Sequence, residues 1–437
     1  MNARVKSAKP GIVHLIGYFK RLFNNPRTIP DTNAFDQSVS ELIRQTERMT
    51  IIFQAVRNGL NQSNTVAISS FGYRKLNWLD WMVGIISFMN WSRGLILIFT
   101  SSERIAIFLG HPLFRAKDRQ ALTIWAVITL SVMFIFREWI LSLEAKGKLE
   151  ILSVWKVCCN GFNRTQLKMG NLHINRFRLT IILVTIVAYC VMPVVPLFTL
   201  VGFFTPVLTN PWMYEIPELA FSCFLGSFSC ALITTFLLNS ILGFTWYFIC
   251  TLVFHLYRLM DLLDRAGRLK KSTRGMNERN IKLLCLLIIR RLNSFELTTR
   301  KLRYVFLYYF FVFASSGDVY IFLGLVVRIY NDVLANILAL IGTIILPAIG
   351  IFGYIFGNFL SELDELTVRL HHLTSKNRLS LKTLNKVSEI MDRVAGPYNG
   401  IKLGDFLTIE KSFFIFFILE NISTLMLFTC NIGPLIN

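Results

Sequence analysis

The side chains of this sequence that could do chemistry are polar residues set inside long apolar runs. The run SFFIFFILENISTLMLF, residues 412–428, carries Glu420 and Asn421 at its centre. A carboxylate in the middle of a bilayer costs about 2.5 kcal/mol or more on insertion scales, so it faces protein or water. Helical spacing predicts one polar stripe, made of Glu420, Ser423, Thr424, Leu427 and Asn431. The stripe either lines a pore, where symmetric copies form an acidic ring that attracts cations, or hydrogen-bonds to neighbouring helices.

Two further charges lie at similar depth in other apolar runs. Arg93 in NWSRGL and Asp318 in ASSGDVY both fall in the predicted outer half of the membrane. Burying either charge alone is costly, so they are expected to pair with each other, to contact a ligand, or to do neither. Arg137 and Glu138 lie nearer the cytosolic side, where a long side chain reaches the interface by snorkelling.

Prolines and aromatic residues indicate a small-molecule pocket among the second to sixth runs. Pro193, Pro196 and Pro347 each remove a helical hydrogen bond and open backbone that a neighbour or a cavity must satisfy. The aromatic candidates at outer-half depth are Trp125, Tyr189, Phe198, Phe221, Phe224, Tyr320 and Phe322. With Arg93 and Asp318 they form the predicted ligand-binding set, and plain packing is the alternative.

Catalysis and metal binding find no support in the motifs. The six histidines are scattered, and adjacent His371 and His372 point to different faces of a helix, whereas a helical metal pair needs i,i+4 spacing. Glycine-rich phosphate loops and the HExxH and GxSxG motifs are absent from the sequence. We therefore expect no enzyme, no cofactor and no metal site.

Composition predicts an all-α polytopic membrane protein. Hydrophobic residues make up 54% of the 437 residues, above the ~45–50% of a soluble protein. Seven runs are long enough to cross a bilayer; they are 79–101, 121–143, 179–204, 218–256, 304–327, 335–361 and 409–430. The fourth run is too long for one crossing. At ~1.5 Å per residue it would extend almost 60 Å, so it is either two tight spans or one helix that projects into the cytosol.

Basic residues predict the orientation of the spans. Segments 1–77, 144–178, 257–303 and 362–407 hold 38 of the 46 Lys and Arg residues, and the alternate connections hold few. The positive-inside rule therefore predicts a cytosolic N-terminus and an extracellular C-terminus. The net charge of +20 reflects this topology and favours acidic lipid headgroups as a partner surface over nucleic acid.

The predicted cytosolic parts are themselves helical. Residues 280–302 place Leu283, Leu284, Leu287, Ile288, Leu292 and Phe295 on one apolar face, and residues 362–395 have a similar pattern. They either pack together below the membrane or lie singly on its surface. One integral domain is expected, with a cytosolic region 1–78, spans one to six over 79–361, a helical linker 362–408 and a last span 409–430.

The architecture and the C-terminal segment resemble the arthropod gustatory receptor superfamily of chemoreceptors, which includes insect odorant receptors. Residues 408–412 resemble the small-polar stretch that opens the family's last helix, and Phe428 falls where its TYhhhhhQF signature ends. Glu420, Asn421 and Leu427 stand at its Thr, Tyr and Gln positions, which indicates a divergent member. The resemblance implies that four copies of the chain form a tetramer, whose central cation pore is lined by the last helix of each subunit. It also implies a cytosolic anchor between the subunits and a ligand pocket in the outer half of each subunit. The gate of the pore would lie near residues 422–428, with Leu425 and Phe428 as apolar candidates.

The expected function is therefore a gustatory receptor-like ligand-gated cation channel for the detection of small molecules. Its expected partners are a tastant, membrane lipid and related receptors in a homo- or hetero-tetramer, in the plasma membrane of a sensory neuron. A G-protein-coupled receptor is one alternative, but DRY-like and NPxxY motifs are absent from spans three and seven. A secondary transporter is the other, and inverted repeats, its best sequence marker, are not evident.

Overall fold

The computed structural model describes residues 32–56, 77–116, 119–146, 158, 162, 164–271, 278–376, 379–396 and 400–431. Much of the predicted cytosolic region 1–78 lies outside these residues. Over the described residues the chain is almost entirely helical. Its elements are α2 (Thr32–Ile52), α3 (Trp78–Phe99), α4 (Glu103–Phe108), α5 (Arg119–Ala145), α7 (Arg164–Leu167), α8 (Asn171–Thr209), α9 (Trp212–Glu215), α10 (Pro217–Lys271), α11 (Glu278–Ile321), the π-helical turn η2 (Phe322–Val326), α12 (Asp332–Lys376), α13 (Leu381–Ala395), β1 (Lys402–Leu403), β2 (Leu407–Thr408) and α14 (Phe413–Asn431).

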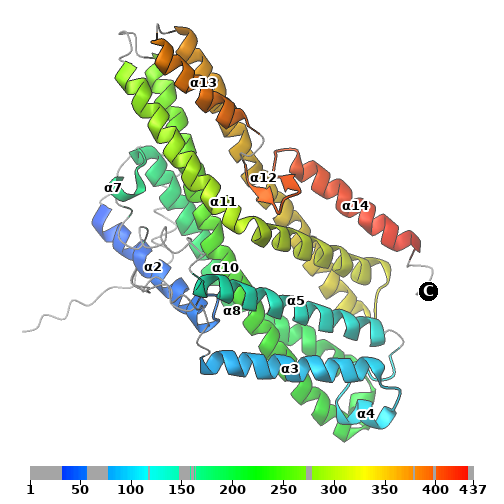
Figure 1. Cartoon of the computed structure of the whole chain (residues 1–437). Helices are drawn as coiled ribbons and strands as arrows, with labels where there is room; N and C mark the ends of the chain where they lie inside the picture. The colour runs from blue at the N-terminus through cyan, green and yellow to red at the C-terminus, as the bar shows by residue number, and fades with distance from the viewer. Residues whose placement is uncertain are drawn as a thin grey trace, which may run out of the picture.

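Seven of these helices are long and apolar enough to cross a membrane, as the sequence predicts. They are α3, α5, α8, α10, α11, α12 and α14. Figure 1 shows that they form one bundle, from which α10, α11 and α12 continue well beyond the shorter helices, together with α13. The chain is therefore an all-α, multi-pass membrane protein.

The long fourth run is one unbroken helix. α10 has 55 residues, which correspond to a length of about 80 Å at ~1.5 Å per residue. The alternative of two tight spans is thereby excluded. The amphipathic segment 280–302 likewise joins the fifth span without a break in α11, and residues 362–376 continue the sixth span in α12.

The projecting parts of these helices pack against one another, so they do not lie singly on a surface. Leu284, Ile288 and Leu292 of α11 are buried, and the rings of Phe295 (α11) and Phe359 (α12) stack with centroids 3.8 Å apart. Leu283 is the exception to the predicted apolar face, since it is 52% exposed. Its outward position leaves an apolar side chain on the surface of the projecting bundle.

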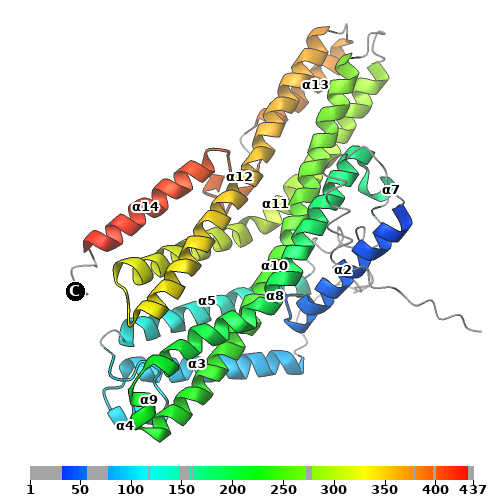
Figure 2. The same cartoon turned by 180° about the vertical axis from the view of Figure 1, so that it is seen from behind.

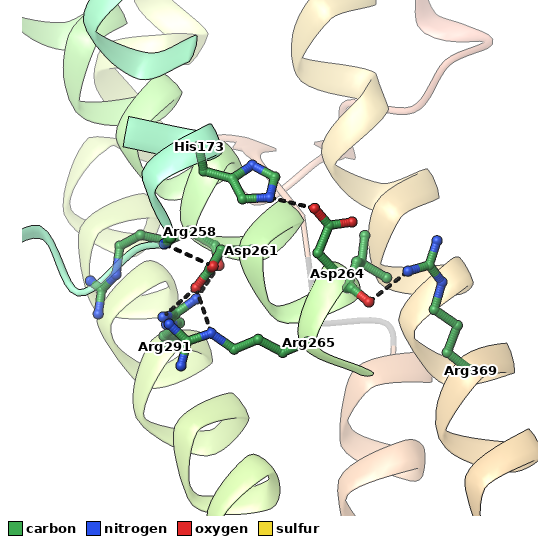
Figure 3. Close-up of polar contacts among 9 residues, drawn as sticks. His173, Arg258, Asp261, Asp264, Arg265, Arg291 and Arg369 are labelled. Atoms are coloured by element: carbon green, nitrogen blue, oxygen red, sulfur yellow. Dashed lines mark hydrogen bonds and ion pairs between the residues drawn. The ribbon is translucent and has the colours of Figure 1, made fainter. Parts of the chain in front are cut away.

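A buried carboxylate joins α8, α10 and α11 in this region (Figure 3). Asp261 of α10 is fully buried, and its Oδ2 lies 3.0 Å from Arg291 Nη2 of α11 and 3.0 Å from Arg265 Nε. Its Oδ1 accepts a hydrogen bond of 3.0 Å from the backbone N–H of Gly170, at the start of α8. The Arg258 carbonyl also accepts from Arg291. The carboxylate of Asp261 thus connects α8, α10 and α11.

Two further contacts extend this cluster to α12. His173 Nε2 of α8 lies 2.7 Å from Asp264 Oδ2 of α10, and Arg369 of α12 donates a 2.6 Å hydrogen bond to the Leu263 carbonyl (Figure 3). The same arginine pairs with Glu365 one turn earlier. Polar contacts therefore hold α8, α10, α11 and α12 in fixed register below the predicted membrane.

Arg137 of α5 does not reach the interface by snorkelling, so that prediction is wrong. Its side chain is fully buried, pairs with Asp80 of α3 at 3.3 Å and with Glu138, and donates to Gln54 just after α2. The guanidinium also lies over the Phe236 ring of α10, 5.6 Å from its centroid. Arg137 therefore joins four separate parts of the chain.

Candidate functional site: α14 and the helices beside it

The last helix, α14, is hardly packed within one subunit. Asn421, which is 6% exposed, is its one buried residue from Phe413 to Cys430. Figures 1 and 2 show α14 at the side of the bundle, beside the second half of α11 and the first part of α12. An apolar helix with so little intramolecular contact is typically covered by lipid or by another protein surface. α14 is therefore the least buried of the seven candidate membrane spans.

The start of α14 is fixed by a short hairpin. β1 and β2 pair antiparallel, and the Gly404 N–H donates a 2.9 Å hydrogen bond to the Arg303 carbonyl of α11. Arg303 also pairs with Asp405 at 2.5 Å. α14 begins at Phe413, so the predicted span 409–430 starts a few residues too early. Residues 408–412, which carry the family resemblance, form the end of β2 and the turn into α14.

Phenylalanine rings fix both ends of α14 against its neighbours. Near its start, Phe413 meets Phe310 of α11 edge to face at 5.1 Å, and the same ring lies where a Cβ on Gly353 of α12 would be. Near its end, Phe428 lies 5.5 Å from the ring of Phe322 in η2. α11 and α14 therefore run side by side from Phe310 to Phe322.

The predicted polar stripe faces away from these neighbours. Glu420, Ser423 and Leu427 are exposed, and Thr424 is half-buried. Asn431 is the last residue of α14, and its side chain lies outside the part of the structure that can be described. The described part of the stripe therefore lies mostly on the exposed side of α14.

The two predicted apolar gate residues lie on a different face. Leu425 and Phe428 are half-buried and pack on the cluster formed by Phe322, Leu323 and Ile329. Within this chain they contact α11 and η2, whereas the exposed face carries Glu420. Any constriction built from Leu425 and Phe428 would require α14 to turn about its axis.

Arg93 and Asp318 do not pair. Arg93 donates a 2.7 Å hydrogen bond to the Leu109 carbonyl and another to the Gly110 carbonyl, after α4. Its guanidinium occupies the position of a Cβ on Gly226 of α10. Arg93 thus holds the connection between α3 and α5, at the predicted outer end, against α10. Asp318 lies elsewhere, in α11, where it is buried.

The predicted ligand-binding residues do not gather around one cavity. Trp125 of α5 and Tyr320 of α11 meet edge to face at 6.1 Å, and Phe322 and Asp318 lie nearby on α11 and η2. The other aromatic members lie on α8 and α10. Phe198, Phe221 and Phe224 are exposed and Tyr189 is half-buried.

A cavity that sequence reasoning missed lies between α8 and α10. Its volume is about 250 Å³, and the described residues that line it are almost wholly apolar: Phe53, Pro196, Leu200, Phe228, Ala231, Leu232, Thr235 and Phe236. None of the nine predicted ligand-binding residues lines it. Pro196, which the sequence had marked as a break in helical bonding, is the one signal that pointed to this place. Ligand pockets of proteins typically run from about 300 to 1,000 Å³, so this space is smaller than a typical pocket. It is also open, since Leu200, Phe228 and Leu232 are exposed.

Potential metal ligands do not gather in the part of the chain that the structure describes. No group of three or more His, Cys, Asp and Glu side chains there is placed to hold a metal ion. His111, which follows α4, is buried beside the connection that Arg93 holds, and its Nδ1 accepts a 3.1 Å hydrogen bond from the Leu113 N–H.

The fold is similar to that of an insect olfactory receptor. The structure of OR5 from Machilis hrabei in complex with eugenol matches with a TM-score of 0.59, over 91% of this chain and 99% of that chain, at 12% sequence identity. No family model matches the sequence, and none of the curated proteins compared with it matches. At 12% identity this likeness shows a shared fold, and that fold is the one that the sequence resemblance implies.

Proposed function

We propose that this chain is a ligand-gated cation channel that detects small molecules, of the gustatory and odorant receptor type. One observation carries the proposal: α14 packs against its own subunit through little more than Asn421 and its half-buried side, and it exposes a stripe with a carboxylate at mid-membrane depth. Such a charge needs water or a partner. A central pore surrounded by copies of α14 supplies water, and its acidic ring attracts cations.

Assembly into tetramers accounts for the apolar surface of the projecting bundle. Leu283 and Leu286 of α11, Val368 of α12 and Leu381 of α13 are all more than half exposed although this region is predicted to be cytosolic. Exposed apolar patches of this kind mark protein interfaces. We infer that they form the anchor between subunits, in homomers or with related receptors.

The ligand is proposed to be a small organic molecule, because the structural neighbour was solved with eugenol bound. Two places suit it. One is the apolar cavity between α8 and α10, and the other is the aromatic group of Trp125, Tyr320 and Phe322 at the outer ends of α5 and α11. We favour taste over smell on the gustatory resemblance of residues 408–412, with the plasma membrane of a sensory neuron as the location.

Patch-clamp recording of cells that express this chain alone tests the proposal. A panel of tastants and odorants is expected to evoke a cation current, and Glu420→Gln is expected to lower cation permeability relative to wild type. A wild-type current with unchanged permeation in Glu420→Gln would remove Glu420 from the pore. The absence of current with every compound, also on co-expression with related receptors, would contradict the channel itself.

Variants that alter one of the two candidate ligand sites test where the ligand binds. If the ligand occupies the cavity between α8 and α10, Leu232→Trp fills that space and shifts the half-maximal ligand concentration upward by tenfold or more. Trp125→Ala is the matched test of the aromatic group. A shift with only one of the two variants assigns the pocket.

A further inference from the structure

The connection between α11 and α12 contains backbone conformations that proteins rarely use. η2 (Phe322–Val326) is π-helical, and the Val327 N–H donates a 3.0 Å hydrogen bond to the Phe322 carbonyl, five residues earlier. Arg328 and Tyr330 have left-handed φ angles of 49° and 69° although neither is a glycine. π-helical turns are frequent at functional sites, and left-handed residues of this kind persist only where surrounding contacts hold them. The contacts of this connection therefore decide whether it keeps its shape.

One set of contacts ties the connection to the end of α8. Asn331 Nδ2 donates a 2.9 Å hydrogen bond to Oγ1 of Thr209, the last residue of α8. The Tyr330 hydroxyl lies 3.4 Å from the carbonyl oxygen of Pro206, which also belongs to α8. Asn331 Oδ1 in turn accepts a 2.8 Å hydrogen bond from the Leu334 N–H at the start of α12. A displacement of the end of α8 is therefore passed to the connection and to the start of α12.

The other side of the connection packs against α14. Phe322, Leu323 and Ile329 form the buried cluster on which Leu425 and Phe428 lie. The ring centroids of Phe322 and Phe428 are 5.5 Å apart. The Ile329 N–H donates a 3.1 Å hydrogen bond to the Leu323 carbonyl, so η2 and the connection hold this cluster together. A change in the backbone of η2 therefore moves the surface that supports the end of α14.

The same cluster reaches the aromatic group that is proposed to hold a ligand. Trp125 of α5 packs on the cluster, and its ring meets that of Tyr320 of α11 edge to face at 6.1 Å. Tyr320 lies two residues before Phe322, where η2 begins. A ligand beside Trp125 would therefore press on the residues that support the end of α14.

The start of α14 is held differently, in notches that glycines leave on α12. The Phe413 ring occupies the position of a Cβ on Gly353, and the Glu410 carbonyl occupies that of a Cβ on Gly357. Small residues at such positions let the backbone and rings of a neighbouring helix approach closely. α14 is thus fixed against α12 at its start, whereas its end rests on η2, whose backbone has two possible helical forms.

We propose that η2 and residues 327–331 form a two-state joint, which couples the ends of α5 and α8 to the end of α14, with Thr209 and Tyr330 as positioning residues. In the state described here, the π-helical turn presents Phe322 to Phe428. In the other state this turn adopts α-helical bonding, which turns Phe322 away from Phe428. Coupling between distant sites needs such an element, whose equilibrium both sites bias. The effect on current rests on the proposed channel function, but the joint itself does not.

Hydrogen–deuterium exchange of the purified full-length protein in detergent tests the joint. The double variant Thr209→Val/Tyr330→Phe keeps the shapes of both side chains and removes their hydrogen bonds between α8 and the connection. The amides of residues 322–331 are expected to exchange about fivefold faster than in wild type, because lost hydrogen bonds favour local opening. The matched control is Thr343→Val/Tyr354→Phe, at exposed positions of α12, and it is expected to exchange as wild type does.

The outcomes separate the joint from the channel. Equal exchange of residues 322–331 in wild type and in Thr209→Val/Tyr330→Phe would overturn the joint. In patch-clamp recordings with a compound that activates wild type, this double variant is expected to raise the half-maximal concentration by about fivefold or more, and the control to leave it unchanged. Faster exchange with an unchanged half-maximal concentration would overturn the coupling to α14. A wild type that carries no current, together with faster exchange in the double variant, would refute the channel and support the joint.

Discussion

At the residue scale, His111 shows how a single buried side chain makes the connection between α4 and α5 sensitive to pH. It follows α4, outside the membrane-spanning helices, and is 1% exposed. Burial lowers the pKa of its imidazole from the usual 6.5 to about 4, and the positive charges of Arg119 and Arg93 add to this effect. The folded protein therefore keeps His111 neutral over a range in which an unfolded chain would protonate it.

This pKa shift predicts a loss of stability in mild acid. Above pH 6.5 His111 is neutral in both states and has no effect. As pH falls from 6.5 toward 4, His111 binds a proton in the unfolded state but not in the folded state. The free energy of unfolding therefore drops by up to about 1.4 kcal/mol per pH unit. Melting temperatures at pH 7.5 and 5.0 measure the drop, and His111→Gln is expected to reduce it. The same pH dependence in wild type and His111→Gln would contradict the assignment.

At the element scale, the contact between α11 and α12 depends on glycines that let the backbones approach closely. A Cβ at Gly342 of α12 would lie 2.7 Å from the Gly317 carbonyl oxygen of α11, closer than atoms tolerate. Small residues at such crossings are typical of membrane helix pairs. This contact supports the part of α11 that carries Asp318.

Gly342→Ala is therefore expected to destabilise the protein by about 1–3 kcal/mol, as overpacking does. Gly84→Ala in α3 is the matched control, because no atom lies within 4 Å of its added Cβ. Thermal unfolding of the two variants in detergent compares them directly. If Gly342→Ala were as stable as Gly84→Ala, α11 and α12 would be able to move apart without loss of stability, and the close glycine contact would not be needed.

The cluster around Asp261 is the second element-scale determinant, since it joins α8, α10 and α11. Arg291→Met leaves the buried carboxylate of Asp261 without its partner from α11, and breaking a buried pair in this way costs about 3–5 kcal/mol. Arg290→Met, at the adjacent exposed position, removes the same charge without a buried partner. Lower expression and melting temperature are expected for Arg291→Met alone. Equal behaviour of both variants would contradict a structural role of the cluster.

At the scale of the whole molecule, the seven spans were predictable from the sequence and the site was not. Lipid-facing helices must be apolar along their whole length. The apolar runs that end near Phe99, Ala145 and Thr209 can therefore be recognised from the sequence as membrane spans. The partners of Arg93 and Arg137 depend on which loops and helices fold back onto them, and no local pattern encodes that choice. Depth alone suggested an Arg93–Asp318 pair, although Arg93 contacts the carbonyls of Leu109 and Gly110 after α4 and Asp318 lies on α11.

The orientation of the bundle remains a prediction and has a direct test. Basic residues gather in segments 1–77, 144–178, 257–303 and 362–407, which predicts that these face the cytosol. Epitope tags on both termini of intact cells are expected to show an accessible C-terminus and a protected N-terminus. An accessible N-terminus would contradict the channel topology and favour a G-protein-coupled receptor.

The central claim is that the exposed face of α14 lines a water-filled cation pore, and cysteine accessibility during ligand-evoked current tests it most directly. The background is Cys430→Ser, because Cys430 is an exposed thiol of α14 itself. A charged, membrane-impermeant thiol reagent is expected to reduce the current of Glu420→Cys, Ser423→Cys and Leu427→Cys, and to leave Leu425→Cys and the background unchanged. Modification of Leu425→Cys with no effect at Glu420→Cys would contradict the account.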